Sequence, residues 1–313
     1  MVQFGSNWIK WPGHHEVSLA IAGGGCKAFY ALGFGYKLRK WGIKFKAMSG
    51  VSAGAAMVMG IISENEEAGL EYAASLTKRN QKNFDLKRLL KGERPFPHEN
   101  IYRRSIRYSL DIEKIRTTDI KIYIQAVLAF PKEDKLTDLF RKTRLIPQTA
   151  HAFLLDEADK LKGKEVYRVN KIIEKWNLKE KIYTNEDLKD PNLIEQIVLN
   201  SSSIPPVLSF QAKDNAYYLD GGLLNNLVLE KFPERDKKIG IYYDDTTIIG
   251  KNLEGLKNTM LIKPSKELKI TTFDYTNPEG LIETYELGKK DAESMKEKIM
   301  DFTQVKLTDY LVA

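Results

Sequence analysis

Cysteine and histidine are both scarce in this sequence. It has one cysteine, Cys26, and four histidines, of which His151 is the last. A single cysteine excludes an internal disulfide framework and a cysteine metal cage, and it favours a reducing compartment. We therefore expect a cytoplasmic protein, with export by a route that needs no signal as the open alternative.

Export signals and membrane-length apolar runs are also missing. No stretch combines a charged start, a short apolar run and a small-residue cleavage site, so no signal peptide is expected. The longest apolar run, Ala47 to Ile62, spans 16 residues and contains three glycines. It is too short for a confident membrane span, which indicates a buried strand and helix rather than a transmembrane segment.

Charge and aromatic residues suggest a membrane surface as a partner. The net charge of +7, from 49 Lys+Arg against 42 Asp+Glu, favours contact with anionic surfaces, although a solvated lysine-rich surface would give the same value. Trp8 and Trp11 flank Lys10, a combination that suits headgroup depth. Core tryptophans of a soluble protein are the alternative. No zinc-finger spacing or RNA-binding consensus occurs, so no nucleic-acid partner is expected.

The first sixty residues alternate between strand and helix patterns. We predict strands over Val17–Ala22 and Ile43–Met48 and helices over Cys26–Trp41 and Ala53–Ile62, a βαβα order that implies parallel strands. The fold class expected is α/β, with a central, largely parallel sheet sandwiched by helices. Further elements are predicted at Lys121–Phe130, Ile194–Leu199, Tyr217–Leu219, Ile239–Tyr243, Met260–Ile262 and, as one helix, 280–301.

No linker or repeat divides the chain. We expect one domain over 1–313, with the motif-bearing core at about 15–245 and a C-terminal extension over 246–313 packed on it. The segment 63–119 is polar, helical in parts and broken by Pro95 and Pro97, whereas 132–185 is charged and mostly helical. The sequence does not indicate the role of either segment.

A serine motif lies between the second strand and the second helix. Gly50-Val51-Ser52-Ala53-Gly54 fits the nucleophile elbow G-x-S-x-G, a sharp turn that projects a serine hydroxyl above the edge of a sheet. Gly50 and Gly54 tolerate the close approach in this turn, and the Ala53 N–H can face a developing oxyanion. A purely structural turn is the alternative.

A glycine loop closes the first strand. Gly23, Gly24 and Gly25 open a helix and can present N–H groups to an anion. A dinucleotide fingerprint requires an acidic residue about 20 positions later, but there is no Asp or Glu from Val17 to Ser63. The Gly-Lys-Ser/Thr of a phosphate-binding P-loop is missing too. An oxyanion hole is the remaining use.

The serine requires a base, and the positions of the histidines argue against a triad. An α/β-hydrolase triad places its histidine late in the chain, whereas every histidine here lies in the first half. Asp220 is the better candidate, because Asp220-Gly221-Gly222 places a carboxylate on a turn after an apolar strand. A dry site would raise its pKa and let it accept the serine proton. A simple turn is again the alternative.

Together, these blocks resemble the patatin-like phospholipase family. The similarity covers about 17–62 and 195–230, and includes Ser201-Ser-Ser-Ile-Pro-Pro-Val207 and Tyr218-Leu-Asp-Gly-Gly-Leu-Leu-Asn-Asn226. Two positions depart from the pattern: Ala28 stands where the glycine loop usually ends in glycine, and Val228 stands where a proline usually occurs.

The resemblance implies a lipid acyl hydrolase with a Ser–Asp dyad and no histidine, metal or cofactor. Ser52 corresponds to the nucleophile, Asp220 to the base, and Gly23, Gly24 and Gly25 to the oxyanion loop. The expected substrate is a phospholipid or another fatty acyl ester. A non-catalytic or acyl-transferring member of the same fold, which binds lipid or protein, is the alternative.

Overall fold

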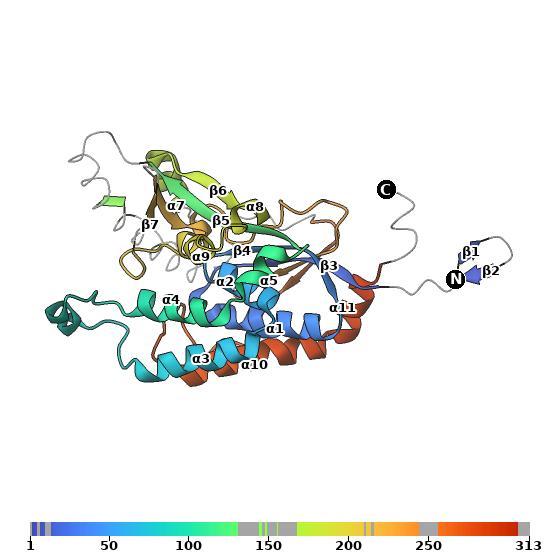
Figure 1. Cartoon of the computed structure of the whole chain (residues 1–313), viewed down its shortest axis with the longest axis horizontal. Helices are drawn as coiled ribbons and strands as arrows, with labels where there is room; N and C mark the ends of the chain where they lie inside the picture. Colours follow the sequence, from blue (N-terminus) through green and yellow to red (C-terminus); the bar gives the residue numbers. More distant parts are fainter. Residues whose placement is uncertain are drawn as a thin grey trace.

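A mixed sheet of eight strands with flanking helices forms the centre of the protein (Figure 1). The structure is a computed structural model that describes residues 2–4, 7–9, 14–130, 144–145, 148, 155, 168–209, 211–213, 216–243 and 256–305. A separate hairpin joins β1 (Val2–Phe4) to β2 (Asn7–Ile9). Trp8 lies in β2, but its side chain and all of Trp11 lie outside the described part, so membrane docking through them stays a prediction.

The sheet has a parallel half and an antiparallel half. Its order is β10-β9-β3-β4-β5-β8-β7, and β6 also pairs with β5. The pairings from β10 to β5 are parallel, whereas β8 and β6 run antiparallel to β5 and β7 runs antiparallel to β8. The predicted α/β class is therefore confirmed. The strands are β3 (Glu16–Ile21), β4 (Lys44–Val51), β5 (Lys121–Ala129), β6 (Lys179–Tyr183), β7 (Gln211–Lys213), β8 (Ala216–Asp220), β9 (Lys238–Ile241) and β10 (Thr259–Ile262).

Most of the described helices lie in the connections between these strands, and the last two follow β10. They are α1 (Phe29–Lys40), α2 (Ala53–Ser63), α3 (Glu66–Arg79), α4 (His98–Ser109), α5 (Ile112–Thr117), α7 (Arg168–Trp176), α8 (Asn185–Leu188), α9 (Ile194–Ser201), α10 (Pro278–Ser294) and α11 (Lys296–Thr303), with 3₁₀ turns η1 (Gly25–Ala28), η2 (Leu86–Lys91) and η3 (Gly221–Leu223). None of these helices has the length and apolar content to span a bilayer.

Two predicted helices differ from the structure in detail. The helix expected from Cys26 begins as the 3₁₀ turn η1, in which the Lys27 N–H donates to the Gly24 carbonyl at 3.1 Å. The Cys26 N–H donates to the Thr272 carbonyl at 3.0 Å. The helix expected over 280–301 is two helices that break at Met295. There the Ser294 hydroxyl donates to the Asp291 carbonyl, and the Met295 N–H is shared between two carbonyls. Such side-chain competition shortens a helix.

Helix α10 lies directly against α1 (Figure 1). A Cβ on Gly33 would lie 2.1 Å from the Tyr285 carbonyl oxygen, and one on Gly288 would lie 2.0 Å from that of Tyr30. The Tyr30 hydroxyl also donates to Asp291 at 2.9 Å. The two backbones are therefore in contact, and β10 adds the segment after 256 to the sheet. The division at 245 stays a prediction.

Two strands share one edge of β5 and meet end to end. β6 pairs with residues 124–128 of β5, and this occupies one edge. β4 pairs with 121–125 and β8 with 126–129, so both must lie along the other edge. β4 runs parallel to β5 and β8 runs against it, which places Val51 opposite Gln125 and Asp220 opposite Ala126. The carboxyl ends of β4 and β8 therefore converge.

Candidate active site

Ser52 occupies the sharp turn between β4 and α2. Its backbone has φ 53° and ψ −128°, which a residue with a side chain seldom adopts, and its side chain is mostly buried. The Ser52 N–H donates to the Ser201 hydroxyl at 2.8 Å, and the Ser52 carbonyl accepts from the Ala55 N–H at 2.9 Å. These bonds hold the strained turn, an arrangement typical of functional sites.

The flanking glycines are required by close packing. A Cβ on Gly54 would lie 2.4 Å from the Ile21 carbonyl oxygen at the end of β3. A Cβ on Gly50 would lie 2.7 Å from the carbonyl oxygen of Gly54 itself. A side chain at either position would push the start of α2 away from the sheet, so these positions set where the Ser52 side chain lies.

Asp220 ends β8 with one carboxylate oxygen occupied and one without a partner. Oδ1 accepts from the Gly222 N–H at 2.7 Å, while Oδ2 is buried and accepts no hydrogen bond of ordinary geometry from the described residues. Burial raises the pKa of Asp220 to about 6, and the nearby Ser52 hydroxyl and the Gly222 N–H partly oppose this rise. A Cβ on Gly221 would lie 2.3 Å from the Gln125 carbonyl oxygen, so this turn also needs glycine.

Gln125 connects the two strand ends. Its amide group donates to the carbonyls of Gly221 and Asn225 at 2.8 and 2.7 Å, which fixes the turn after Asp220. Its own backbone carbonyl accepts from the Ser201 hydroxyl at 2.5 Å, and Ser201 in turn accepts from the Ser52 N–H. A single buried residue of β5 thus positions both turns.

The glycine loop lies beside Ser52, and its N–H groups are not equivalent. Gly23 donates to the Asn226 side chain at 3.0 Å and accepts from it at 3.2 Å, so its N–H is already engaged. Gly24 and Gly25 donate to no acceptor in the part of the chain that is described. Gly25 has φ +54° and abuts the Thr272 carbonyl, which only glycine permits without strain.

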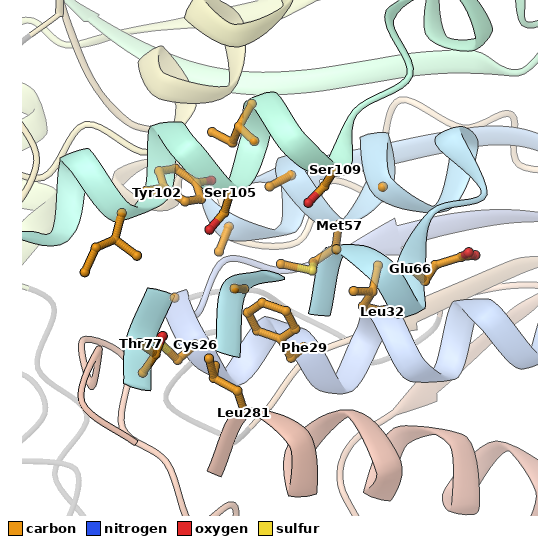
Figure 2. A pocket seen from close by; sticks show the side chains of 18 of the residues that line it. Cys26, Phe29, Leu32, Met57, Glu66, Thr77, Tyr102, Ser105, Ser109 and Leu281 are labelled. Carbon is orange, nitrogen blue, oxygen red and sulfur yellow. The ribbon is translucent and has the colours of Figure 1, made fainter. Parts of the chain in front are cut away.

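A crevice at Ser52 leads toward an apolar cavity. The crevice is lined by Ser52, Ala53, Gly25, Tyr102 and Tyr275, together with Ser202, Ile204, Leu208 and Phe273. The cavity shares Gly25, Ala53, Tyr102 and Tyr275 with it and has a volume of about 70 Å³. Figure 2 shows Tyr102, Ser105 and Ser109 on α4 along one side, with Phe29, Leu281 and Cys26 opposite.

The described histidines have other partners. His14 bonds with Glu16, His15 with Thr303, and His98 with the carbonyl of Phe273. Burial lowers the pKa of His98. His151 lies outside the described residues. Within the described ranges, no group of three or more His, Cys, Asp and Glu side chains is arranged to hold a metal.

The two departures from the family pattern lie in packed positions. Ala28 ends η1 and is fully buried, as expected for an alanine in the first helical turn. Val228 is also fully buried, and its carbonyl accepts from the Ser49 hydroxyl at 2.5 Å. The Ser49 hydroxyl is therefore engaged by Val228.

Sequence reasoning missed Gln125, Ser201 as an acceptor, and the aromatic walls Tyr102 and Tyr275. Gln125 had a detectable signal, because it is a lone polar residue within the apolar strand 122–129. The tyrosines had none, since their role depends on how α4 and the 271–275 loop approach η1 and α2 in three dimensions.

The fold and these residues define an α/β protein with a serine elbow beside a buried carboxylate. The family model described as patatin-like phospholipase matches residues 19–232, and the chain belongs to that family. The predicted resemblance is therefore confirmed, and the family acts on lipid substrates. No curated protein matches the chain. Among solved structures, VipD from Legionella pneumophila is 16% identical with a TM-score of 0.44, covering 94% of this chain and 68% of VipD.

Replacing Asp220 by Asn should stabilise the fold at neutral pH. The folded-state pKa is raised from 3.8 to about 6, so the protonated form contributes stability that is fully present below pH ~4 and is lost as pH rises through ~6. Asn keeps an acceptor for Gly222 and carries no charge. We expect the free energy of unfolding at pH 7 to rise by up to about 3 kcal/mol. Denaturant titrations at pH 7 and pH 3.5 measure it.

The difference should disappear at the lower pH. If the stability of the variant relative to the wild type is no greater at pH 7 than at pH 3.5, ionisation of the buried Asp220 costs the fold nothing, and the raised pKa is wrong.

Proposed function

We propose that this protein hydrolyses fatty acyl esters of lipids, with Ser52 as nucleophile and Asp220 as general base. The observation that carries the proposal is the buried Asp220 Oδ2, which has no ordinary hydrogen bond among the described residues and lies next to the Ser52 hydroxyl. A carboxylate with a pKa of about 6 is ionised at neutral pH, yet it binds a proton more readily than an exposed aspartate.

The proposed reaction has two steps. Asp220 Oδ2 takes the Ser52 hydroxyl proton as Ser52 Oγ attacks the ester carbonyl, and the protonated Asp220 then returns that proton to the departing alcohol. Asp220 next takes a proton from water as the water oxygen attacks the acyl-enzyme carbonyl. The bond to Ser52 Oγ then breaks, the fatty acid is released, and Asp220 returns the proton to Ser52 Oγ.

The oxyanion is assigned to N–H groups that the fold leaves available. Those of Gly24 and Gly25 have no acceptor among the described residues, and the Ala53 N–H opens α2, where the helix dipole is positive. Gly23, predicted as a third member of the hole, donates to Asn226 in this structure. Its proposed contribution is to fix the loop and not to bind the oxyanion directly.

The apolar cavity is proposed to receive the acyl chain. The cavity adjoins the crevice at Ser52, because Gly25, Ala53, Tyr102 and Tyr275 line both. The proposed substrate is a phospholipid or lysophospholipid, whose acyl chain would enter the cavity while the headgroup stays outside. We also propose peripheral contact with an anionic membrane surface. A cytoplasmic location stays a prediction from the single cysteine.

The dyad is tested against a histidine-dependent mechanism by two variants. Asp220→Asn should lower kcat on p-nitrophenyl acyl esters by about 100-fold or more, because the proton acceptor is lost. Replacing His14, His15, His98 and His151 together by Gln should leave kcat within roughly tenfold. Gln at position 98 can still donate to the Phe273 carbonyl. The kcat of the wild type should fall below pH ~6 as Asp220 is protonated.

Thermal melts establish first that each variant is folded. A folded histidine-free protein without activity, together with an active Asp220→Asn, would overturn the dyad. Complete inactivity of the wild type on esters of every chain length would favour the alternative, a non-catalytic or acyl-transferring member of the family.

Chain-length preference tests the cavity. Ala56 lies in α2 and lines the cavity, so Ala56→Leu adds volume where the end of an acyl chain would lie. We expect kcat/KM for long-chain esters to fall at least tenfold relative to short-chain esters, a size typical of a steric change in an apolar pocket. Ala68→Leu, on the partly exposed surface of α3, is the matched control. An equal loss at all chain lengths would contradict the assignment.

A further inference from the structure

An arm of residues 80–97 projects from the body of the protein between α3 and α4 (Figure 1). Its outer part is the 3₁₀ helix η2, in which no residue is buried. Leu90 is 90% exposed, Leu86 61% and Leu89 56%, and the nearby Phe84 is 49% exposed. Four of the seven exposed large apolar side chains in the described ranges thus lie within seven consecutive residues.

Packing within the protein does not account for these leucines. Phe84 contacts the ring of Phe96 across the arm at 5.1 Å, which stiffens the arm itself. The Asp85 side chain accepts from the Lys87 N–H at 3.0 Å and caps η2. The arm is therefore a formed element with an apolar tip, and exposed tips of this kind mark interaction surfaces.

The same tip is basic. Residues 82–94 contain five Lys and Arg against Asp85 and Glu93. Lys82, Lys87 and Lys91 are exposed, and their side chains form no ion pair with the described residues. The two arginines differ from the lysines, since Arg88 pairs with Glu93 at 2.9 Å and Arg94 pairs with Glu99. Exposed leucines surrounded by lysines suit the interface of an anionic bilayer, where apolar side chains enter the acyl region and lysines contact phosphates. The positive charge of the tip disfavours its association with the same tip of a second copy.

The base of the arm is bonded to both loops that wall the crevice. Asn80 donates to the Tyr275 carbonyl at 2.8 Å, and the Tyr275 N–H donates to Asn83 at 2.8 Å. On the other side, Arg94 donates to the Pro206 carbonyl. Tyr275 lines the crevice beside Ser52, and Pro206 lies between the crevice residues Ile204 and Leu208. A partner surface that binds the tip of the arm would therefore lie near the entrance to the crevice at Ser52.

We propose that the arm is the element that docks this protein on anionic lipid bilayers, with Leu86, Leu89 and Leu90 entering the acyl boundary and Lys82, Lys87 and Lys91 contacting lipid phosphates. The inference rests on the proposed function only because that function places the substrate in a membrane. Docking itself requires no catalysis.

Vesicle co-sedimentation tests the docking in a Ser52→Ala background, so that lipid is not consumed. Wild-type-like binding should require phosphatidylserine or phosphatidylglycerol and weaken with salt. Leu89→Ser/Leu90→Ser should lower the partition coefficient at least tenfold, and Lys87→Gln/Lys91→Gln by about tenfold or more. The matched control is Ile282→Ser/Lys298→Gln, which changes an exposed apolar residue and an exposed lysine on α10 and α11.

The control should bind like the parent protein. Equal binding to phosphatidylcholine vesicles, unchanged binding by the arm variants, or an equal loss in the control would each overturn the proposal. So would a dimer in solution that the leucine substitutions dissociate, because the partner would then be a second copy.

A fluorescent label gives an independent measurement. Cys26 is buried and is the single cysteine, so an environment-sensitive fluorophore on Leu90→Cys reports the tip selectively. Its emission should shift to the blue with anionic vesicles, whereas the same label on Ile282→Cys should not shift. A shift at position 282 alone would place the docking surface elsewhere. If the Ser52→Ala protein binds anionic vesicles but the wild type hydrolyses no ester, the docking role of the arm is supported and the proposed function is rejected.

Discussion

The site depends on one constraint of the sheet, the sharing of a single edge of β5 by β4 and β8. Because β4 runs with β5 and β8 runs against it, their carboxyl ends meet at the Gln125–Ala126 step. Hydrogen bonds from Gln125 then fix the turn after Asp220 and, through Ser201, the turn at Ser52. If β8 ran parallel to β5, its carboxyl end would point away from the carboxyl end of β4, and the two ends could not meet on this edge. The antiparallel half is therefore part of the catalytic design that we propose.

This arrangement has an energetic cost. Bringing two strand ends together buries Asp220 and raises its pKa, and it forces Ser52 into a positive φ. Both effects destabilise the native state. The surrounding glycines, the Ser201 hydroxyl and the Gln125 side chain hold the geometry in place. Such concentration of strain and desolvation in one place is expected where function, and not stability, has selected the residues.

Much of the fold was predictable from sequence, because the strands and helices that build the sheet centre have strong local signals. The runs at 17–22, 43–48 and 121–130 and the glycines that follow the first two predicted β3, β4 and β5 within a few residues. The antiparallel direction of β8 was not predictable, since it depends on long-range pairing. The positions of Tyr102 and Tyr275 in the crevice were equally inaccessible, because they depend on how α4 and the 271–275 loop approach one another. The proximity of Ser52 and Asp220 could be predicted only through the resemblance to a family.

The central claim is that Asp220 activates Ser52, and covalent labelling with a fluorophosphonate measures this most directly. Peptide mass spectrometry should place the adduct on Ser52, with a labelling rate that increases with pH around a midpoint near 6. Labelling of Asp220→Asn should be about 100-fold slower. An adduct on another serine, or equal rates in the wild type and in Asp220→Asn, would contradict the account.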